Sequence, residues 1–400
     1  MRNEGTNVGL TLLRASALEI PLASESVDCI VTSPPYYGLR EYSGEQVCRW
    51  PAVWWTVMAG TDELETSAQE CPYGGEDGIL SYVAHTVAVC RGLRRVLKPT
   101  GTLWWNIGDC YNGSGGAGGD YGPGGIREGQ PRYKGRLEGE LKRKDLIFVP
   151  ARVALALQAD GWWLRSAVIW HKKSAMPEPG FDRPSSAHEF ILMLTPRADY
   201  YYDWFGVSPG QNDNEGERIG KNLRSVWTMP TSDWSGEHFA VFPDELPGTA
   251  IRASTSRHGV CPDCGAPWER IIEREKADRD MEGQRKADAE RTGRTDGRVM
   301  GPSGKVDKVF SVGWQATCIH ADLVPVPATV LDPFTGSGTT GKVARQLGVN
   351  FVGLDLSAEY LDQQARIRVL GQTPKGALDS LPLFGGPLSG TAGPLPPDPE

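Results

Sequence analysis

The sequence predicts an α/β protein with a doubly wound, Rossmann-like sheet, and two segments near opposite ends of the chain carry this prediction. Residues 27–31 form an apolar, strand-like run that is soon followed by the adjacent prolines Pro34 and Pro35. Residues 328–331 form a second apolar run, which leads through the glycine-rich turn 332–341 into a helical pattern. Strand, glycine turn and helix in this order are typical of a nucleotide-cofactor site.

The first segment continues as Ser33, Pro34, Pro35 and Tyr36. Each proline fixes its own φ and keeps the residue before it out of helical geometry, so we expect a stiff, extended backbone. Because prolines lack an N–H, the carbonyls of this turn have no strand to pair with and can face a cavity. The pattern indicates a cradle for a flat polar ring, with an ordinary strand exit as the alternative.

The second segment offers groups that suit a cofactor with a ribose. Gly336 and Gly338 permit a tight turn, and a further apolar run over residues 350–354 ends in Asp355. A carboxylate at the carboxyl end of a strand can accept hydrogen bonds from ribose hydroxyls. These residues therefore predict a cofactor-binding edge of the sheet.

The nature of the cofactor depends on the residues beside the glycines. Gly336, Gly338 and Gly341 also have the spacing of dinucleotide-binding proteins, so a nicotinamide oxidoreductase is an alternative. Asp332 and Phe334 precede the glycines. A carboxylate there suits the cationic amino-acid end of S-adenosylmethionine and would repel a pyrophosphate, which favours a methyltransferase.

Together, Asp332-Pro333-Phe334 before the glycines and Ser33-Pro34-Pro35-Tyr36 resemble the motifs of the DNA amino-methyltransferases, which use S-adenosylmethionine. The order, with the catalytic motif first and the cofactor glycines last, resembles the permuted β group, so a circularly permuted sheet is expected. The resemblance implies that the catalytic residues are Ser33, Pro34, Pro35 and Tyr36. It implies cofactor contacts from two stretches of chain, namely Asp332, Phe334, Gly336, Ser337, Gly338, Thr339 and Asp355, and His238, Ala240, Phe242 and Pro243.

The resemblance also implies a mechanism on double-stranded DNA. The hydroxyl of Ser33 and the carbonyl of Pro34 would accept hydrogen bonds from the amino group of a flipped base, while Tyr36 stacks on its ring. Adenine enzymes of this family typically carry Asp or Asn in place of Ser33, so the target is expected to be cytosine N4, with adenine N6 as the alternative. A non-catalytic, zinc-dependent DNA-binding protein on the same scaffold is an alternative of another class.

Composition sets the broad class. The chain has 400 residues, 39% of them hydrophobic, and can bury a large core. We find neither a long apolar run nor a signal-peptide pattern, so a cytoplasmic protein without membrane contact is expected. A net charge of −8 argues against a general nucleic-acid binder but leaves room for a local basic face. A cognate restriction endonuclease is a further expected partner.

Between the two motifs, helical and strand patterns alternate. A strand over residues 10–13 precedes Ser16, which by the resemblance stands where the family usually has an acidic contact to the cofactor's adenine. Residues 41–78 read as an irregular insertion, either packed by its own aromatic rings or touching DNA. The remaining patterns predict a helix over 79–97, a stop at 98–101, a strand over 102–107, a strand over 162–170 and a helix over 246–253. The glycine-rich residues 112–135 are expected to be mobile, either as a lid over bound DNA or as a plain disordered loop.

Several residues are candidates for helix caps or for the rim of the pocket. Ser337 or Thr339 is expected to cap the helix after the glycine turn, and Ser357 the next one. Asp145 is expected to cap a helix over 146–159. His188, at the head of a strand, suits either the rim of a substrate pocket or the core.

Cys261, Cys264, Cys318 and His320 form a candidate metal site. Cys-x-x-Cys on a tight turn is a common zinc knuckle, and Cys-x-His supplies a third thiolate and an imidazole for a closed tetrahedral site. Free cysteines are the alternative. The polar stretch 269–308 between the two pairs is expected to be a flexible excursion that the metal anchors.

The predicted organisation has four parts. Residues 1–256 form the catalytic part of the methyltransferase domain, with loops that contact DNA, and 257–322 form a small zinc-binding insertion. Residues 323–372 form the cofactor-binding part, and the proline- and glycine-rich residues 373–400 form a disordered tail.

Overall fold

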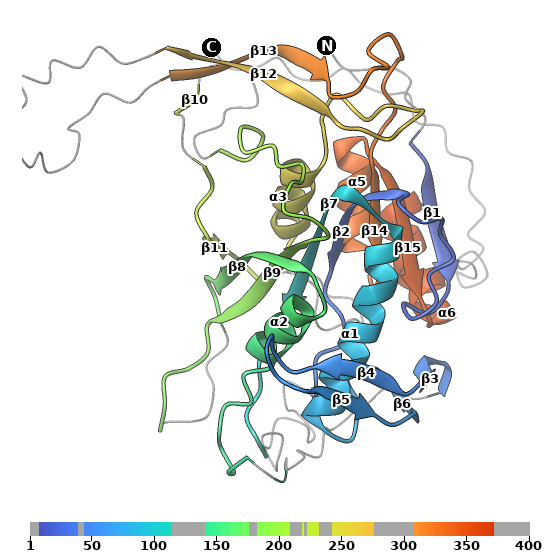
Figure 1. Ribbon diagram of the computed structural model, residues 1–400, viewed down its shortest axis with the longest axis vertical. Helices are drawn as coiled ribbons and strands as arrows, with labels where there is room; N and C mark the ends of the chain where they lie inside the picture. Colours follow the sequence, from blue (N-terminus) through green and yellow to red (C-terminus); the bar gives the residue numbers. More distant parts are fainter. Residues whose placement is uncertain are drawn as a thin grey trace, which may run out of the picture.

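The computed structural model describes residues 8–38, 44–113, 139, 141–175, 182–208, 218–219, 222–231, 242–275 and 308–371. In this part of the chain an eight-stranded sheet runs through the molecule in the order β1-β15-β14-β2-β7-β9-β8-β11 (Figure 1). The strands in this order are Leu10–Arg14, Asn350–Asp355, Thr329–Asp332, Val27–Thr32, Leu97–Ile107, His188–Thr195, Trp163–Lys172 and Val226–Met229.

The sheet is mixed. From β1 to β7 all neighbouring strands are parallel, whereas β9 is antiparallel to both β7 and β8. Parallel strands all leave the sheet at the same edge. The residues that follow β1, β2, β14 and β15 therefore gather at one end of the sheet, although they come from both ends of the chain.

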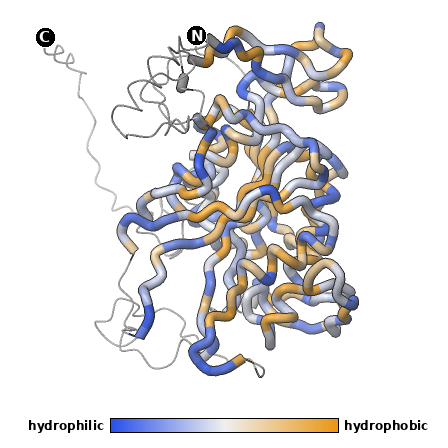
Figure 2. The backbone as a smooth tube through the Cα atoms, turned by 60° about the vertical axis from the view of Figure 1, so that its left-hand side comes forward, coloured by the Kyte–Doolittle hydropathy of each residue, from blue (hydrophilic) through white to orange (hydrophobic). Residues whose placement is uncertain are grey.

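Helices cover both faces of the sheet, as predicted for a doubly wound fold. One hydrophobic cluster includes residues of α1 (Ile79–Val96) and α2 (Val149–Ala159). The second includes residues of α3 (Glu245–Ser254), α5 (Thr339–Leu347) and the π-helix η3 (Leu361–Leu370). In Figure 2 the chain in the middle of the molecule is largely orange, in keeping with these two cores. None of the described helices has the length and apolar character needed to cross a bilayer.

The strands show why the sheet has a core on both sides. All six residues of β2 are buried, which suits a central parallel strand covered by helices on each face. In β7, Trp104 belongs to the cluster under α3 and Trp105 to the cluster under α1. Successive side chains of a strand point to opposite faces, so adjacent tryptophans fill separate cores.

The predicted irregular insertion at residues 41–78 is wrong for the described part, residues 44–78. After the short 3₁₀ helix η1 (Gly44–Gln46), β3 (Val47–Trp50) pairs with β6 (Gln69–Pro72), and β4 (Val53–Thr56) pairs with β5 (Glu63–Thr66). Trp50 and Trp55 are buried in the core beneath α1, whereas Trp54 is half exposed. The aromatic rings thus pack against the main body of the protein.

The predicted end of the helix before residues 98–101 is confirmed, since α1 ends at Val96, but the strand predicted over 102–107 begins earlier, at Leu97. The ladder between β2 and β7 shifts register between Val27 and Cys29, which accommodates the turn-like residues as an irregularity within the strand. Gly101 permits this, since a Cβ there would come within 2.8 Å of the carbonyl oxygen of Asp28. Gly101 is therefore needed because the two strand backbones come close together at this point. In the sequence alone, the same glycine suggests a turn.

Two of the three cap predictions are wrong. The N-cap of α5 is Gly338, at φ +79°, and no side chain caps it. The helix predicted over 146–159 begins at Val149, whose N–H donates to Asp109 Oδ1 at 2.9 Å, so the carboxylate comes from a distant loop and not from Asp145. Ser357 is confirmed as a cap, since its Oγ accepts the N–H of Tyr360 at the end of α6 (Ala358–Tyr360).

A second sheet contains β10 (Arg218–Ile219), β13 (Lys308–Ala316) and β12 (Trp268–Glu275). The prediction of a flexible segment over residues 269–308 is therefore wrong at both ends of that segment, because these ends pair as antiparallel strands. Arg270 anchors this sheet: its Nε lies 2.8 Å from Asp203 Oδ2, and its guanidinium lies 4.2 Å from the ring centroid of Trp314. The predictions for residues 114–135 and 373–400 fall outside the described residues, as do His238 and Ala240.

Candidate active site

A cavity of about 250 Å³ lies where the parallel strands end. It brings together the two segments that the sequence singles out, although they are about 300 residues apart in the chain. The residues that line it and that follow β2, β14 and β15 are Ser33, Pro34, Pro35, Tyr36, Pro333, Phe334, Gly336, Asp355 and Leu356. Ser16, which follows β1, lies on the same wall.

Asp332 joins the two motifs directly. It is 2% exposed, and its Oδ1 accepts a hydrogen bond of 2.7 Å from Thr32 Oγ1, the residue before Ser33. Its other oxygen accepts a bond of 2.7 Å from Thr340 Oγ1 in α5. Burial raises the pKa of Asp332 from 3.8 to about 6, against the opposing effect of these hydroxyls. The carboxylate therefore holds the ends of β2 and β14 together.

The raised pKa gives a prediction for stability. Between about pH 4 and pH 6 the folded protein keeps a proton on Asp332 that the unfolded chain releases, so stability falls as pH rises through this window. Asp332→Asn should remove this slope and change stability by under about 1 kcal/mol, because an amide keeps the hydrogen bonds. Asp332→Ala should cost about 2–4 kcal/mol by stranding both threonines. Urea unfolding from pH 4 to pH 7 measures both, and an unchanged slope in the Asn variant would contradict this account.

Asp355 lies at the cavity wall at the end of β15. Its carboxylate accepts the N–H of Gly336 at 2.8 Å and the N–H of Ser357 at 2.9 Å, while burial raises its pKa above the ordinary value. The carboxylate thus ties the glycine turn to the next strand and remains at the surface of the cavity.

Several predicted cofactor residues lie outside the cavity. Ser337, Gly338 and Thr339 are not among its lining residues; instead, Arg368 of η3 donates to the hydroxyls of Ser337 and Thr339 at 2.8 and 2.9 Å. Phe242 is buried in the cluster under α3, and Pro243, which also does not line the cavity, accepts the N–H of Leu246.

An aromatic wall, made of Phe334, Tyr73 and Trp50, closes one side of the cavity. The ring of Phe334 stacks on Tyr73 at 5.4 Å and 13°, and Trp50 packs against Tyr73 at 5.6 Å. Trp50 also stacks on the buried His85 at 4.0 Å. The paired strands β3 and β6 thus reach the cofactor turn, and residues in or next to them line the cavity, namely Gln46, Cys48, Trp50, Pro72 and Tyr73. Sequence patterns did not indicate this contribution.

A polar cluster beside Ser33 is a second feature that the sequence patterns missed. Ser33 Oγ lies 3.1 Å from Tyr36 Oη, which in turn donates to Glu189 Oε2 at 2.6 Å. Asn106 Nδ2 reaches both Tyr36 Oη and Glu189 Oε2, at 2.7 and 2.9 Å. Burial and the nearby Glu189 carboxylate hold the pKa of Tyr36 well above its ordinary value, so its hydroxyl stays protonated. The neighbouring His188 is exposed, which suits neither the core nor this cavity.

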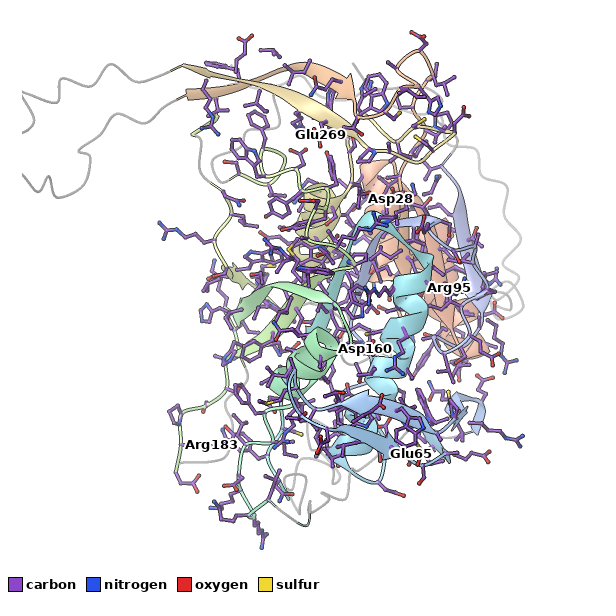
Figure 3. All side chains as sticks on the ribbon, in the orientation of Figure 1. Asp28, Glu65, Arg95, Asp160, Arg183 and Glu269 are labelled. Carbon is purple, nitrogen blue, oxygen red and sulfur yellow. The ribbon has the colours of Figure 1, made fainter. Side chains whose placement is uncertain are left out.

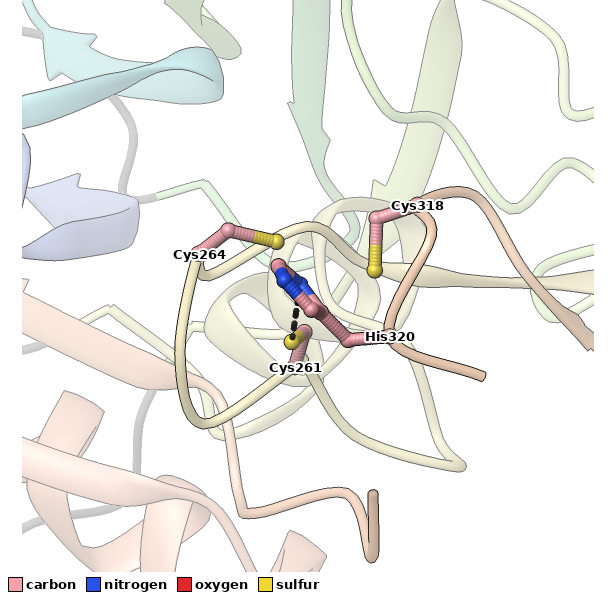
Figure 4. Close-up of side chains that lie close together, drawn as sticks. All are labelled: Cys261, Cys264, Cys318 and His320. Atoms are coloured by element: carbon pink, nitrogen blue, oxygen red, sulfur yellow. Dashed lines mark hydrogen bonds between the residues drawn. The ribbon is translucent and has the colours of Figure 1, made fainter. Parts of the chain in front are cut away.

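The four predicted metal ligands lie together (Figure 4). Single ligand atoms of Cys261, Cys264, Cys318 and His320 all lie within 4.8 Å of one another, and Cys261 Sγ is 3.7 Å from His320 Nδ1. Backbone N–H groups, that of Cys264 first, lower the pKa of Cys261 to about 6. Three sulfurs and one imidazole nitrogen at this separation match a tetrahedral zinc site.

This cluster lies at the opposite end of the sheet from the cavity. The knuckle contacts Lys98, whose Nζ lies 3.3 Å from the Gly265 carbonyl and 2.7 Å from Asp28 Oδ1, at the beginning of β2. In Figure 3, Asp28 lies in the part of the molecule nearer to Glu269, which belongs to β12. Glu65, which belongs to β5, lies at the other end of the view. The cavity, by contrast, lies where β2 ends.

Comparison with known proteins identifies the family. The N6_N4_Mtase family model, described as DNA methylase, matches residues 27–264 and 320–366. The chain is 34% identical over 348 residues to Type II methyltransferase M.SmaI of Serratia marcescens, covering 85% of this chain and 83% of the relative. It is 34% identical over 364 residues to Type II methyltransferase M.Cfr9I of Citrobacter freundii, covering 88% and 86%. A solved structure titled PvuII DNA methyltransferase (cytosine-N4-specific) aligns with TM-score 0.48 and 15% identity, covering 90% of this chain and 85% of that chain.

The match to the family model includes both segments that line the cavity, the one at Ser33 and the one at Gly336. It is interrupted between residues 264 and 320, where β12 and β13 lie. The nicotinamide alternative is set aside by this match. The chain belongs to the N6_N4_Mtase family of DNA methylases and is an S-adenosylmethionine-dependent DNA methyltransferase.

Proposed function

We propose that this enzyme methylates the exocyclic amine of a base flipped out of double-stranded DNA, and that this base is cytosine, methylated at N4. The observation that carries the proposal is the shared cavity, in which Ser33 and Pro34 face the residues of the cofactor turn. A flipped base is the only way for a base edge inside a duplex to reach such an enclosed site.

The target amine is a poor nucleophile because its lone pair is delocalised into the ring. Acceptors placed at its hydrogens localise that lone pair and stabilise the positive charge that develops on nitrogen. Pro35's carbonyl accepts the hydroxyl of Tyr82 at 3.1 Å, whereas the carbonyl of Pro34 has no hydrogen bond recorded in the described residues. Ser33 Oγ and the Pro34 carbonyl are therefore the proposed acceptors.

S-adenosylmethionine, when bound, supplies an electrophilic methyl group on a sulfonium. The amine nitrogen, held by Ser33 and Pro34, would bond to this methyl carbon as the carbon–sulfur bond breaks, which would release S-adenosylhomocysteine as the product, and the amine would then lose a proton to solvent. No covalent enzyme intermediate is needed. The main contribution of the protein is to hold the two reactants in line, which can account for much of the rate.

The residues of the cavity fit this cofactor. Asp355 can accept a ribose hydroxyl, and Gly336 lets the backbone come close to the ligand. Phe334 and the rest of the aromatic wall offer flat apolar surface for an adenine, with Ser16 as a hydrogen-bonding neighbour. Asp332 remains the proposed partner of the cationic amino-acid end through its charge, although it does not line the cavity and both of its oxygens accept threonine hydroxyls.

The proposed target atom rests on Ser33. Expressing the protein in a host without its own DNA methylation and mapping modified bases by single-molecule sequencing should show N4-methylcytosine in one short motif. N6-methyladenine in its place would overturn the cytosine assignment and leave the fold and cofactor assignments unchanged. Unmodified DNA, together with retained binding of radiolabelled S-adenosylmethionine, would favour a non-catalytic DNA-binding protein.

The order of the motifs supports a circular permutation as part of this proposal. The strand before the cofactor turn, β14, comes late in the chain, yet it lies between β15 and β2 at the centre of the parallel region. Two curated relatives are named Type II methyltransferases. We therefore also propose a cognate restriction endonuclease as a partner in the cell.

Zinc is the proposed occupant of the four-ligand cluster. The site offers Cys261, Cys264, Cys318 and His320, which leaves a tetrahedral ion no vacancy for a substrate. Its place at the amino end of β2 also separates it from the cavity. A structural metal that fastens the β12–β13 hairpin to the sheet is the role we propose.

A further inference from the structure

We propose that Glu189, clamped by Lys172, is a positioning residue that makes Ser33 a pure hydrogen-bond acceptor towards the target amine. The proposal rests on the proposed function, because it assigns a purpose to the polar cluster beside Ser33 for that reaction. The cluster links β2, β7, β8 and β9: Tyr36 follows β2, Asn106 is the last but one residue of β7, Lys172 ends β8 and Glu189 is the second residue of β9.

Glu189 has well-defined partners for both oxygens. Oε1 accepts Lys172 Nζ at 2.5 Å, and Oε2 accepts Tyr36 Oη at 2.6 Å and Asn106 Nδ2 at 2.9 Å. The side chain is 13% exposed and that of Lys172 is 24% exposed. An ammonium has only donors and a carboxylate only acceptors, so the direction of every hydrogen bond around Glu189 is fixed.

The fixed donor and acceptor roles around Glu189 also determine in which direction the Tyr36 hydroxyl donates. Its single hydroxyl hydrogen goes to Glu189, so its oxygen can only accept from its other two neighbours, Asn106 Nδ2 at 2.7 Å and Ser33 Oγ at 3.1 Å. The amide of Asn106, which is 2% exposed, cannot be turned over, because its oxygen would then face the Glu189 carboxylate. The donor and the acceptor are thereby identified in each of the three hydrogen bonds of the Tyr36 hydroxyl.

Ser33 is the last member of this series of hydrogen bonds, and it lines the cavity. Its only hydrogen points to Tyr36, and one of its lone pairs accepts Asn106 Nδ2 at 3.4 Å, so the other lone pair remains for a ligand. A hydroxyl that could rotate would present either a donor or an acceptor; here only an acceptor is presented. This polarity fits a ligand with an N–H group, as in an exocyclic amine, and disfavours a carbonyl at the same place.

Replacing the carboxylate by an amide should remove the fixed polarity. In Glu189→Gln the amide oxygen must face Lys172, which has only donors, so the NH₂ group turns to Tyr36 and Asn106. Asn106 then no longer faces a carboxylate and can turn its oxygen towards this NH₂ group and Tyr36, so the Tyr36 hydrogen can point to Asn106 or to Ser33. Ser33 is then no longer held as an acceptor, and in part of the molecules its hydrogen points into the cavity, where it meets the hydrogens of the target amine.

The same reasoning predicts an unusual rescue. If Lys172 is also replaced, in Glu189→Gln with Lys172→Met, the amide oxygen is free to turn back to Tyr36 and Asn106, and the original polarity returns. Lys172→Met alone should lower the rate, because it leaves Glu189 without its cationic partner. The second substitution is thus harmful in the parent protein and beneficial in the Gln variant.

Single-turnover methylation at saturating DNA and cofactor tests this in the full-length protein. Glu189→Gln should lower the rate by about 100-fold, as loss of a preorganised hydrogen-bonding group does. The Glu189→Gln, Lys172→Met protein should regain about tenfold over the Gln variant, with the cofactor Kd unchanged throughout. A double variant no faster than Glu189→Gln, or a Gln variant as fast as the parent, would overturn the proposal.

A second variant covers the case in which Glu189→Gln does not fold. Tyr36→Phe keeps the ring but cuts the connection between Glu189 and Ser33, and should lower the rate to a similar extent; a rate equal to that of the parent would overturn the proposal. Methylation of DNA by the parent protein distinguishes a failure of the proposed function from a failure of the role proposed for Glu189. If it methylates no DNA, the proposed function fails; if it does and these variants behave otherwise than stated, the role of Glu189 fails.

Discussion

Tyr36→Ala and Pro34→Ala are expected to abolish DNA methylation while leaving S-adenosylmethionine binding nearly unchanged. Tyr36 orients Ser33 through its hydroxyl, and its ring lies against Gly108, where a Cβ would come within 2.8 Å of it. Removing the ring therefore removes both the orientation of the acceptor and one wall of the base site. Pro34→Ala adds an N–H and frees φ, so its carbonyl loses a fixed direction.

The expected loss is at least about 100- to 1,000-fold in the rate of methyl transfer for each variant, by analogy with the loss of a preorganised hydrogen bond. Transfer of radiolabelled methyl groups to DNA gives the rate, and isothermal titration gives the cofactor Kd. Tyr200→Phe is a matched control, because it removes a tyrosine hydroxyl outside the cavity whose hydrogen-bond partner among the described residues is Arg165, at 3.3 Å. Normal turnover in both Tyr36→Ala and Pro34→Ala would refute the catalytic assignment.

Cys264→Ser should lose the proposed zinc ion and destabilise the protein. The purified parent protein is expected to carry about one equivalent of Zn²⁺, and metal binding to a closed site contributes directly to folding. We expect the variant's thermal midpoint to fall by at least about 4 °C, equivalent to roughly 2 kcal/mol. Elemental analysis and calorimetry measure the two quantities.

Two further measurements separate a structural metal from a catalytic one. Cys48→Ser removes a cysteine outside the cluster and should keep the full metal content. Because the cluster contacts the beginning of β2 and the cavity lies at its end, the folded fraction of Cys264→Ser should keep the cofactor Kd of the parent protein. Absence of metal from gently purified parent protein would count decisively against the site.

Much of the site could be predicted from local chemistry. Prolines and glycines act on their own φ and on the adjacent residues, so the exits of β2 and β14 could be placed without knowing the fold. Alternating helical and strand patterns were enough for the α/β class. The Cys-x-x-Cys and Cys-x-His pairs could be singled out as candidate ligands because a metal constrains ligand type and spacing, and the structure brings the four side chains together.

Other expectations failed where a distant group decided the outcome. Ser337 and Thr339 were reasonable cap candidates, yet Arg368, which is 31 and 29 residues away, binds their hydroxyls. Asp145 had the right side chain for a cap, but Asp109 reaches the first N–H of α2 across 40 residues. The local preference of a residue for a helix-cap position is weak, and a charged side chain that the fold brings close can override it.

By itself, the sequence determined the strand exits, the glycine turn and, through these, the family, and it pointed to the two pairs of candidate metal ligands. Only the tertiary structure decided that Trp50 and Tyr73 meet Phe334 in the aromatic wall and that Glu189 and Asn106 direct Tyr36 from 153 and 70 residues away. The physical reason is the range of the forces involved. Backbone restraints act within a few residues, whereas a buried hydrogen-bond network forms only when packing has brought its members together.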